Sequence, residues 1–257
     1  MKPYYENAGI TIYHGDCREV LPSLGRSQCA VVDPPYGETS LEWDSWQRGF
    51  MDYVDADSMW VFGSLRMFML RSKEFASAKW SFSQEIVWEK HNGSNFHADR
   101  FRRIHELAAL FYQGAWEGIY KCPQFTNDAT ARAVRRKGRP PHTGNIEATP
   151  YVSFDGGPRL QRSVIQVRSC HGHAQHPTQK PLGIVEPLVL YSCPPGGMVV
   201  DPFMGSGTVL VAAKIANRSS VGIEIKEEYC EIAAKRLEET LSFDEAAPHQ
   251  AQHPSAC

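Results

Sequence analysis

The chain has 257 residues, of which 42% are hydrophobic, and a formal net charge of −2 at pH 7. This length and composition suit one large domain that buries a substantial core and carries an insertion. The start lacks the apolar stretch of a signal peptide, and no apolar run approaches the ~20 residues that span a bilayer. We therefore expect a soluble, cytoplasmic protein with no membrane contact.

Strand and helix patterns alternate along the chain, which predicts a mostly parallel α/β sheet. We expect strands at residues 10–13, 29–32, 59–62, 83–89, 106–112, 198–200 and 220–224. We expect helices at residues 17–24 and 64–78, one that starts at 44–46, one that starts near 208, and an amphipathic one at 227–241.

The stretch Asp33-Pro34-Pro35-Tyr36 follows an apolar strand and is therefore expected at the edge of the sheet where ligands bind. The two prolines remove backbone donors and keep the chain extended, which leaves carbonyls free to face a substrate. A carboxylate and a carbonyl can accept the two N–H bonds of a planar, amino-bearing base, and Tyr36 can stack on its face. For this stretch alone, a plain proline-rich turn is the alternative.

A second motif runs from Asp201 to Thr208 as Asp-Pro-Phe-Met-Gly-Ser-Gly-Thr, between a strand and an apolar helix. Its two glycines allow a sharp bend, and the helix N-terminus that follows favours a carboxylate or phosphate. Glu224 ends the next predicted strand and can accept both hydroxyls of a ribose. Leu210 replaces the third glycine of G-x-G-x-x-G, so a nucleoside without a pyrophosphate fits better than a dinucleotide.

With Gly15-Asp16, Phe62 to Ser64, Val87 to Lys90 and His176 to Pro181, these motifs give the chain a clear family likeness. The sequence resembles the amino-group DNA methyltransferases of the β class, in which the motif order is circularly permuted. The resemblance implies a Rossmann-like methyltransferase fold, a mostly parallel seven-stranded sheet with helices on both faces and an inserted target-recognition region. It also implies methyl transfer from S-adenosylmethionine to the amino group of a base flipped out of double-stranded DNA.

The resemblance also implies roles for individual residues. The catalytic set is Asp33, Pro34, Pro35 and Tyr36, with Asp33 and the Pro34 carbonyl as acceptors for the amino group. The cofactor set places Phe203, Gly205 and Gly207 at the methionine portion, Glu224 at the ribose, Asp16 near the adenine amino group, and Thr178 and Lys180 towards the carboxylate. Asp33, Asp201, Ser206 and Thr208 complete the cofactor set. The D-P-P-Y form favours N6 of adenine, with N4 of cytosine as the alternative.

The permuted order divides the chain into a catalytic half at 1–113, a target-recognition region at 114–175, a cofactor-binding half at 176–241 and a C-terminal tail at 242–257. Within the target-recognition region a local basic patch can steer DNA despite the near-neutral total charge, although a solvated loop is the alternative. The expected DNA contacts are Arg132, Arg135, Arg136, Lys137 and Arg139. Homodimers occur in this class, but no interface is visible in the sequence.

Other interpretations stay open at this point. An inactive DNA-binding homologue, or a methyltransferase that acts on RNA or protein, would share the same scaffold. Cys170, His171, His173 and His176 offer four potential zinc ligands. Structural zinc sites use spaced pairs of ligands, and this run has no second pair nearby, so we expect a loop and no metal.

Overall fold

The computed structural model of the chain describes residues 2–77, 79–94, 98–134, 151–170, 172, 174, 176 and 178–240. The chain divides into two compact units, one made of residues 1–122 with 163–257 and the other of residues 123–162. Within the described ranges, no helix combines the length and apolar character needed to cross a membrane.

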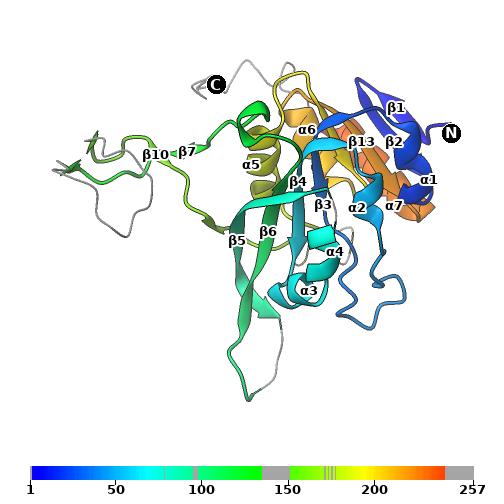
Figure 1. The fold of residues 1–257 in the computed structure, drawn as a ribbon, viewed down its shortest axis with the longest axis horizontal. Helices are drawn as coiled ribbons and strands as arrows, with labels where there is room; N and C mark the ends of the chain where they lie inside the picture. The colour runs from blue at the N-terminus through cyan, green and yellow to red at the C-terminus, as the bar shows by residue number, and fades with distance from the viewer. Residues whose placement is uncertain are drawn as a thin grey trace. The chain divides into compact units, whose positions relative to one another are not determined.

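The larger unit is built on one nine-stranded sheet (Figure 1). Its strands, in spatial order, are β1 (Tyr5–Asn7), β2 (Ile10–His14), β13 (Ser219–Glu224), β12 (Met198–Asp201), β3 (Ser27–Val32), β4 (Ala56–Gly63), β6 (Arg103–Tyr112), β5 (Ser81–Ser94) and β11 (Val164–Gln166). The five strands from β2 to β4 are mutually parallel, and β6 runs antiparallel to both its neighbours.

The expected α/β class with a mostly parallel sheet is confirmed, although the described sheet has nine strands where we expected seven. The two edges account for the difference. The short strand β1 folds back antiparallel onto β2, and β11 adds a parallel strand beside β5. Both strands are only three residues long and carry too little apolar alternation to stand out in the sequence.

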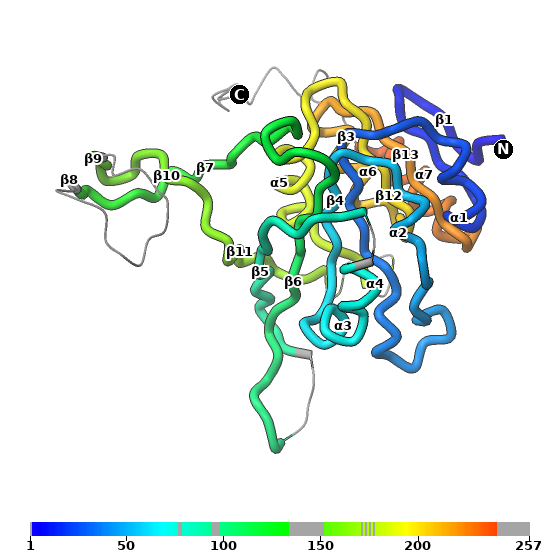
Figure 2. Tube along the Cα trace, viewed as in Figure 1, coloured from blue at the N-terminus to red at the C-terminus, as the bar shows by residue number. Residues whose placement is uncertain are grey.

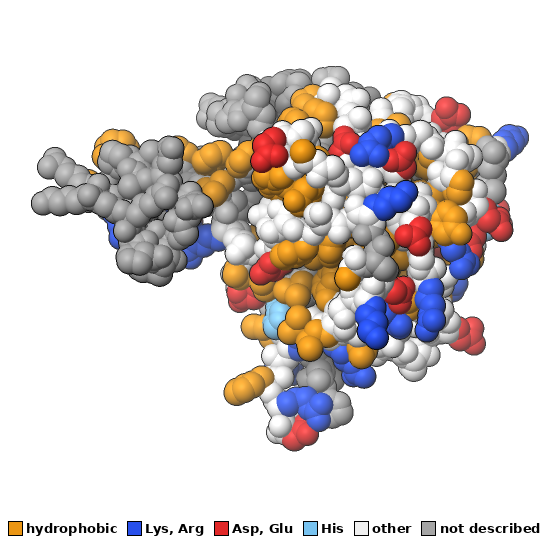
Figure 3. Space-filling model, in the orientation of Figure 1, with side chains coloured by type: hydrophobic (Ala, Val, Ile, Leu, Met, Phe, Trp, Pro, Cys, Tyr) orange, Lys and Arg blue, Asp and Glu red, His pale blue; other side chains and the backbone are white. Residues whose placement is uncertain are grey.

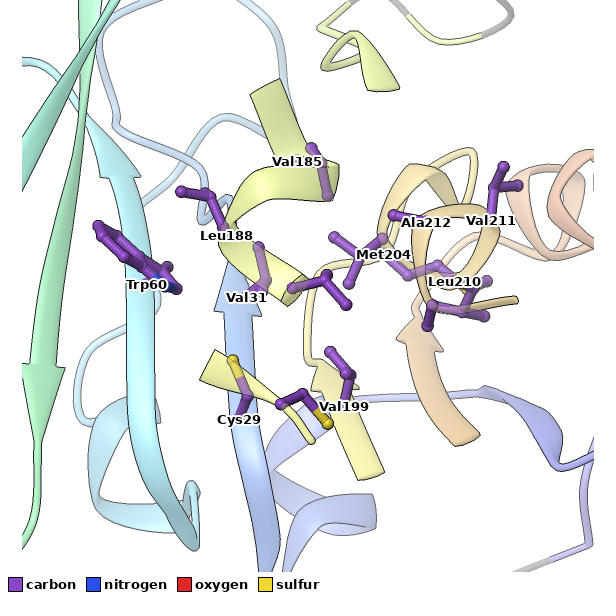
Figure 4. Packing of buried hydrophobic residues seen from close by; sticks show 14 of the residues in the cluster. Cys29, Val31, Trp60, Val185, Leu188, Val199, Met204, Leu210, Val211 and Ala212 are labelled. Atoms are coloured by element: carbon purple, nitrogen blue, oxygen red, sulfur yellow. The ribbon is translucent and has the colours of Figure 1, made fainter. Parts of the chain in front are cut away.

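The central strands are buried on both faces, because a helical layer covers each side of the sheet. Along β3, Cys29 and Val31 face one core, whereas Ala30 and Val32 face the other. Residues of α5 (Leu182–Ser192), α6 (Thr208–Ile215) and α7 (Glu227–Glu239) fill the first core, and residues of α1 (Cys17–Val20), α2 (Phe50–Tyr53), α3 (Leu65–Leu70) and α4 (Ser72–Ser77) fill the second. Figure 4 shows Val185 and Leu188 of α5 beside Val31 in the first core.

The prediction misplaced one helix and missed another. The helix expected to start at residues 44–46 begins only at Phe50, and Figure 2 traces the loop between β3 and α2 that precedes it. Asp44 does not cap this helix. Its carboxylate accepts the N–H groups of Gly37, Glu38 and Thr39 at 2.7–3.0 Å and so closes the loop that follows D-P-P-Y. Helix α5, which we did not predict, contains Pro187, a residue that normally argues against a helix.

The smaller unit consists of two short antiparallel pairs: β7 (Phe125–Thr126) with β10 (Arg159–Leu160), and β8 (Arg132–Val134) with β9 (Tyr151–Ser153). It lies inside the expected target-recognition region, whereas β11 and a 3-10 helix at Trp116–Gly118 belong to the larger unit.

Of the expected DNA contacts, Arg132 is an exposed residue of β8. Arg135, Arg136, Lys137, Arg139 and the tail at 242–257 lie outside the described residues. On the face drawn in Figure 3, the coloured Lys and Arg side chains are interspersed with Asp and Glu. The DNA-contact assignment therefore stays a prediction.

Candidate active site

Four acidic residues follow or end neighbouring parallel strands. Asp16 comes two residues after β2, Asp33 directly follows β3, and Asp201 and Glu224 are the last residues of β12 and β13. Because these strands are parallel and adjacent, their carboxyl ends meet at one edge of the sheet, where such folds bind ligands. All four residues line one cavity.

The same cavity brings together most of the predicted site. Besides the four acids, it is lined by Pro35, Thr178, Lys180, Phe203, Gly205, Ser206 and Thr208. The D-P-P-Y corner and the glycine turn, 168 residues apart from Asp33 to Asp201, therefore share one cavity. Pro34, Tyr36 and Gly207 are not among its lining residues, although Tyr36 and Pro34 adjoin lining residues of the same corner.

Both carboxylate oxygens of Asp33 are held by side-chain donors. The Tyr36 hydroxyl donates to Oδ1 at 2.8 Å, and the Lys180 ammonium donates to Oδ2 at 2.6 Å. Burial raises the pKa of Asp33, and the Lys180 charge acts against that rise. A carboxylate oxygen can accept more than one hydrogen bond, so Asp33 keeps acceptor capacity for a substrate. No hydrogen bond among the described residues ends on the Pro34 carbonyl.

Lys180 is a buried cation held between two carboxylates. Its ammonium also lies 3.4 Å from Oε2 of Glu106 on β6, and the other oxygen of Glu106 accepts a hydrogen bond from Lys90 on β5. Burial lowers the pKa of Lys180, but Asp33 and Glu106 outweigh this effect and raise the pKa overall. Burial likewise opposes ionisation of Glu106, but Lys180 and Lys90 outweigh it and lower its pKa. Glu106 belongs to no motif that we recognised in the sequence.

Backbone donors hold Glu224. The Gly205 N–H donates to Oε2 at 3.0 Å and the Lys226 N–H donates to Oε1 at 2.9 Å. Burial raises the pKa of Glu224 despite these two hydrogen bonds. Gly207 has φ +78°, and a Cβ there would lie 2.8 Å from the Cβ of Ala233 on α7. This glycine is therefore required by the turn and by the close approach of α7.

His176 forms an aromatic part of the cavity wall, although we assigned it no cofactor or catalytic role from the sequence. Its ring lies against Trp43 and Tyr229, with ring centroids 5.6 and 4.3 Å away, and within 3.6 Å of a Cβ placed on Gly205. Burial, reinforced by Lys180 and Lys226, lowers the pKa of His176 to about 4. The ring is therefore neutral near pH 7, and the H-P-T-Q-K-P motif was the signal that could have identified it.

The two remaining predicted acids differ in environment. Asp16 caps α1 and pairs with the Arg18 guanidinium, whose hydrogen bonds lower the pKa of Asp16. Asp201 is only 3% exposed, and its Oδ1 accepts the Phe203 N–H at 3.1 Å. Burial raises the pKa of Asp201 well above its usual range. Asp16 is therefore a charged, partly exposed wall residue, whereas Asp201 is a buried turn former.

The cavity suits a cationic nucleoside. Apart from the buried Asp201, three acidic residues line it against two lysines, Lys180 and Lys226, so its charge favours a ligand with positive groups. Apolar side chains such as Phe203 and Ile223 offer contacts for a flat ring, and the N-terminus of α6 favours a carboxylate. These are the chemical parts of S-adenosylmethionine: a sulfonium, an ammonium, a carboxylate, a ribose and an adenine.

The sheet order and the acidic cavity define a Rossmann-like α/β protein that binds a nucleoside at the carboxyl ends of its strands. More specifically, the chain belongs to the N6/N4 DNA methylase family, which matches residues 27–235. It is 48% identical over 264 residues to the Type II methyltransferase M2.DpnII of Streptococcus pneumoniae, with 92% of each chain covered.

Two solved structures share its fold. The M1.HpyAVI complex with S-adenosylmethionine has a TM-score of 0.58 and 24% identity, over 88% of this chain and 98% of that one. The cytosine-N4-specific PvuII DNA methyltransferase has a TM-score of 0.61 and 17% identity, over 96% and 93% of the two chains. The chain is thus a DNA methyltransferase of the N6-adenine/N4-cytosine family, whose methyl donor is S-adenosylmethionine.

Proposed function

We propose that this protein methylates N6 of adenine at a specific site in double-stranded DNA. The observation that carries the proposal is the shared cavity, in which the Asp33 carboxylate lies at the same sheet edge as Glu224 and the Gly205 turn. The D-P-P-Y form of the corner supports adenine as the target base. The smaller unit at residues 123–162 is the proposed target-recognition element, with Arg132 as a candidate DNA contact.

The cofactor would be held by the residues of the glycine turn and the strand ends. Each oxygen of Glu224 has one backbone donor and can still accept a ribose hydroxyl. Asp16 would accept from the adenine amino group, and Thr208 at the start of α6, whose hydroxyl accepts from Arg236, can still donate to the carboxylate. The Ser206 hydroxyl already donates to Gln179, so Ser206 would serve through the turn that it occupies. When bound, S-adenosylmethionine supplies a methyl group that the amino nitrogen takes as the carbon–sulfur bond breaks, its electron pair staying on sulfur.

The Asp33 corner would make the amino nitrogen reactive. An exocyclic amino group delocalises its lone pair into the base ring and is a poor nucleophile. Asp33 and the Pro34 carbonyl would accept its two N–H bonds, which makes the nitrogen more tetrahedral and turns the lone pair towards the methyl group. This alignment is a proximity effect that can contribute ~7–11 kcal/mol. The surplus proton then leaves the product nitrogen for water.

Access to the amino group requires base flipping, because a paired base cannot reach a cavity of this kind. Tyr36 would hold Asp33 through its hydroxyl, as observed, and present its ring to the flipped base. The prolines on either side of the Pro34 carbonyl keep this corner extended.

The test is to incubate the protein with labelled S-adenosylmethionine and mixed-sequence duplex DNA, digest the DNA to nucleosides and identify the methylated one by mass spectrometry. We expect N6-methyladenine. Label in N4-methylcytosine would overturn the base assignment, and label in neither would overturn the function. An Asp33→Ala variant should lose incorporation and keep cofactor binding, whereas equal loss of both would mean that Asp33 mainly holds the cofactor.

A further inference from the structure

Four alternating charges form a continuous chain that leads from the cavity into the sheet. Asp33 pairs with Lys180 at 2.6 Å, Lys180 pairs with Glu106 at 3.4 Å, and Glu106 pairs with Lys90. The four residues come from four separate segments of the sequence. The side chains of the inner three are 9–15% exposed, so water screens their interactions only weakly.

The sheet fixes the positions of Glu106 and Lys90, the inner two of these four charged residues. In the antiparallel pairing of β5 with β6, Trp88 lies opposite Glu106, and Lys90 is two residues further along the same face of β5. The Lys90 ammonium lies 4.5 Å from the centre of the Trp88 ring, and the Trp88 indole donates to the Val167 carbonyl at 2.8 Å. Strand β6 thus fixes the backbone of Glu106, and the Lys90 ammonium, packed against Trp88, holds its carboxylate.

Glu106 does not line the cavity, and its Oε2 is buried with no hydrogen-bond partner in the described part of the chain. The Lys180 ammonium lies 3.4 Å from this oxygen. A buried, ionised carboxylate is costly unless it is paired, and Lys180 and Lys90 offset that cost for Glu106. Glu106 therefore lies where it can hold the Lys180 ammonium from the side opposite Asp33.

We propose that Glu106 is a positioning residue for methyl transfer, which holds the Lys180 ammonium against Asp33 and so fixes the orientation of the Asp33 carboxylate. Lys180 has a long side chain with several rotatable bonds, and Asp33 alone would leave it free to pivot. With Glu106 on its other side, the ammonium is held at one point, and the Asp33 lone pairs stay aimed at the amino group. Lys90 acts only through Glu106. This inference rests on the proposed function.

The first test is Glu106→Gln, which keeps the shape of the side chain and removes its charge. We expect kcat to fall about 10- to 100-fold, because small misplacements of a reacting group have effects of this size. The KM for DNA and the cofactor Kd should stay at the wild-type values, since Glu106 touches neither ligand. Glu85→Gln, at an exposed acid on the same strand as Lys90, is the matched control and should leave kcat unchanged.

The pH profile separates positioning from general loosening. Burial raises the pKa of Asp33, the Lys180 charge lowers it, and the Glu106 charge raises it by less than Lys180 lowers it. If Glu106 holds Lys180 in place, Glu106→Gln lets the ammonium move away from Asp33, and the acid limb of the kcat profile should move to higher pH. An acid limb that moves to lower pH would mean that Lys180 stays at Asp33 without Glu106, and would overturn the proposal.

A double-mutant cycle tests whether Lys90 acts only through Glu106. Lys90→Met should lower kcat in the wild-type background, and it should have no further effect in the Glu106→Gln background, because Lys90 then has nothing to hold. Additive losses would overturn the proposal, as would a Glu106→Gln variant with wild-type kcat or with equal losses in kcat and cofactor binding. If Glu106→Gln fails to fold, the Lys90→Met variant with the same kcat, KM and Kd measurements decides. A wild-type protein that methylates no DNA would instead overturn the proposed function.

Discussion

Two carboxylates of the cavity, Asp33 and Glu224, are held in opposite ways. The donors to Asp33 are side chains, and the Lys180 ammonium comes from 147 residues away. The donors to Glu224 are backbone N–H groups at most 19 residues away. Side-chain donors lose rotamer freedom and need support from further residues, whereas the chain path already fixes backbone donors.

This difference separates two tasks. A carboxylate held by the local backbone gives a rigid cradle that depends little on the rest of the protein. Such a cradle suits the cofactor, which is the same molecule in every reaction cycle. A carboxylate held by distant charged side chains depends on the whole sheet, and its protonation and direction can be tuned by its neighbours. We therefore expect changes at Asp33 to alter turnover and changes at Glu224 to alter cofactor affinity.

The largest expected effect is on turnover in Asp33→Asn. The amide places a donor where the base needs an acceptor and leaves Lys180 facing a neutral group, so kcat should fall by about 10²- to 10³-fold. Single-turnover methylation of duplex DNA measures this loss, and calorimetric titration of the cofactor should show little change. If cofactor binding weakened by the same factor as kcat fell, Asp33 would serve cofactor binding as Glu224 does, and the proposed difference between the two carboxylates would be wrong.

Glu224→Gln should have the converse effect. Loss of the charged acceptor for the ribose hydroxyls should weaken cofactor binding by about 1.5–3 kcal/mol, or roughly 10- to 100-fold in Kd. At saturating cofactor, kcat should return close to the wild-type value. Equilibrium dialysis with labelled cofactor gives the Kd, and persistent loss of kcat at saturation would mean that Glu224 also serves the chemical step.

The backbone cradle can be broken through its glycine turn. Gly207→Ala forces a side chain into a left-handed position and against Ala233, so the free energy of unfolding should fall by about 1–3 kcal/mol. Gly196→Ala is the matched control, because Gly196 has a similar φ of +73° with no atom within 4 Å of the added Cβ. Chemical denaturation of both variants should show the larger loss at Gly207. Equal losses would show that packing against α7 contributes nothing.

The smallest effect should come from Asp201→Asn, a change in stability that depends on pH. Burial raises the folded pKa of Asp201 well above its usual range, so its stabilising, protonated form is lost as pH rises through that value. Asparagine keeps the acceptor for the Phe203 N–H and removes the charge, so Tm at neutral pH should rise by about 2–4 °C for each kcal/mol recovered. The gain should vanish in acid. A lower Tm at neutral pH would mean that the ionised form is the stable one.

The strands that carry Asp33, Asp201 and Glu224 could be read from the sequence, because each is an apolar run that ends in an acid. Side-chain partners could not be read in this way. We expected a helix to start at 44–46, but the Asp44 carboxylate accepts three N–H groups of the preceding loop instead. Helix α5 was missed because Pro187 interrupts its pattern, although Ile184 and Leu188 have helical spacing and are fully buried.

The sequence by itself determined the family, the strand ends and the identity of the acidic residues, because local apolar patterns and contiguous motifs encode them. Only the tertiary structure decided that Lys180 lies between Asp33 and Glu106, that His176 is a neutral wall of the cavity, and that Tyr36 bonds to Asp33 through its hydroxyl. Those contacts join segments more than 70 residues apart or depend on side-chain direction. Burial and pairing of this kind are set by how the whole sheet brings its strand ends together, and no local pattern records them.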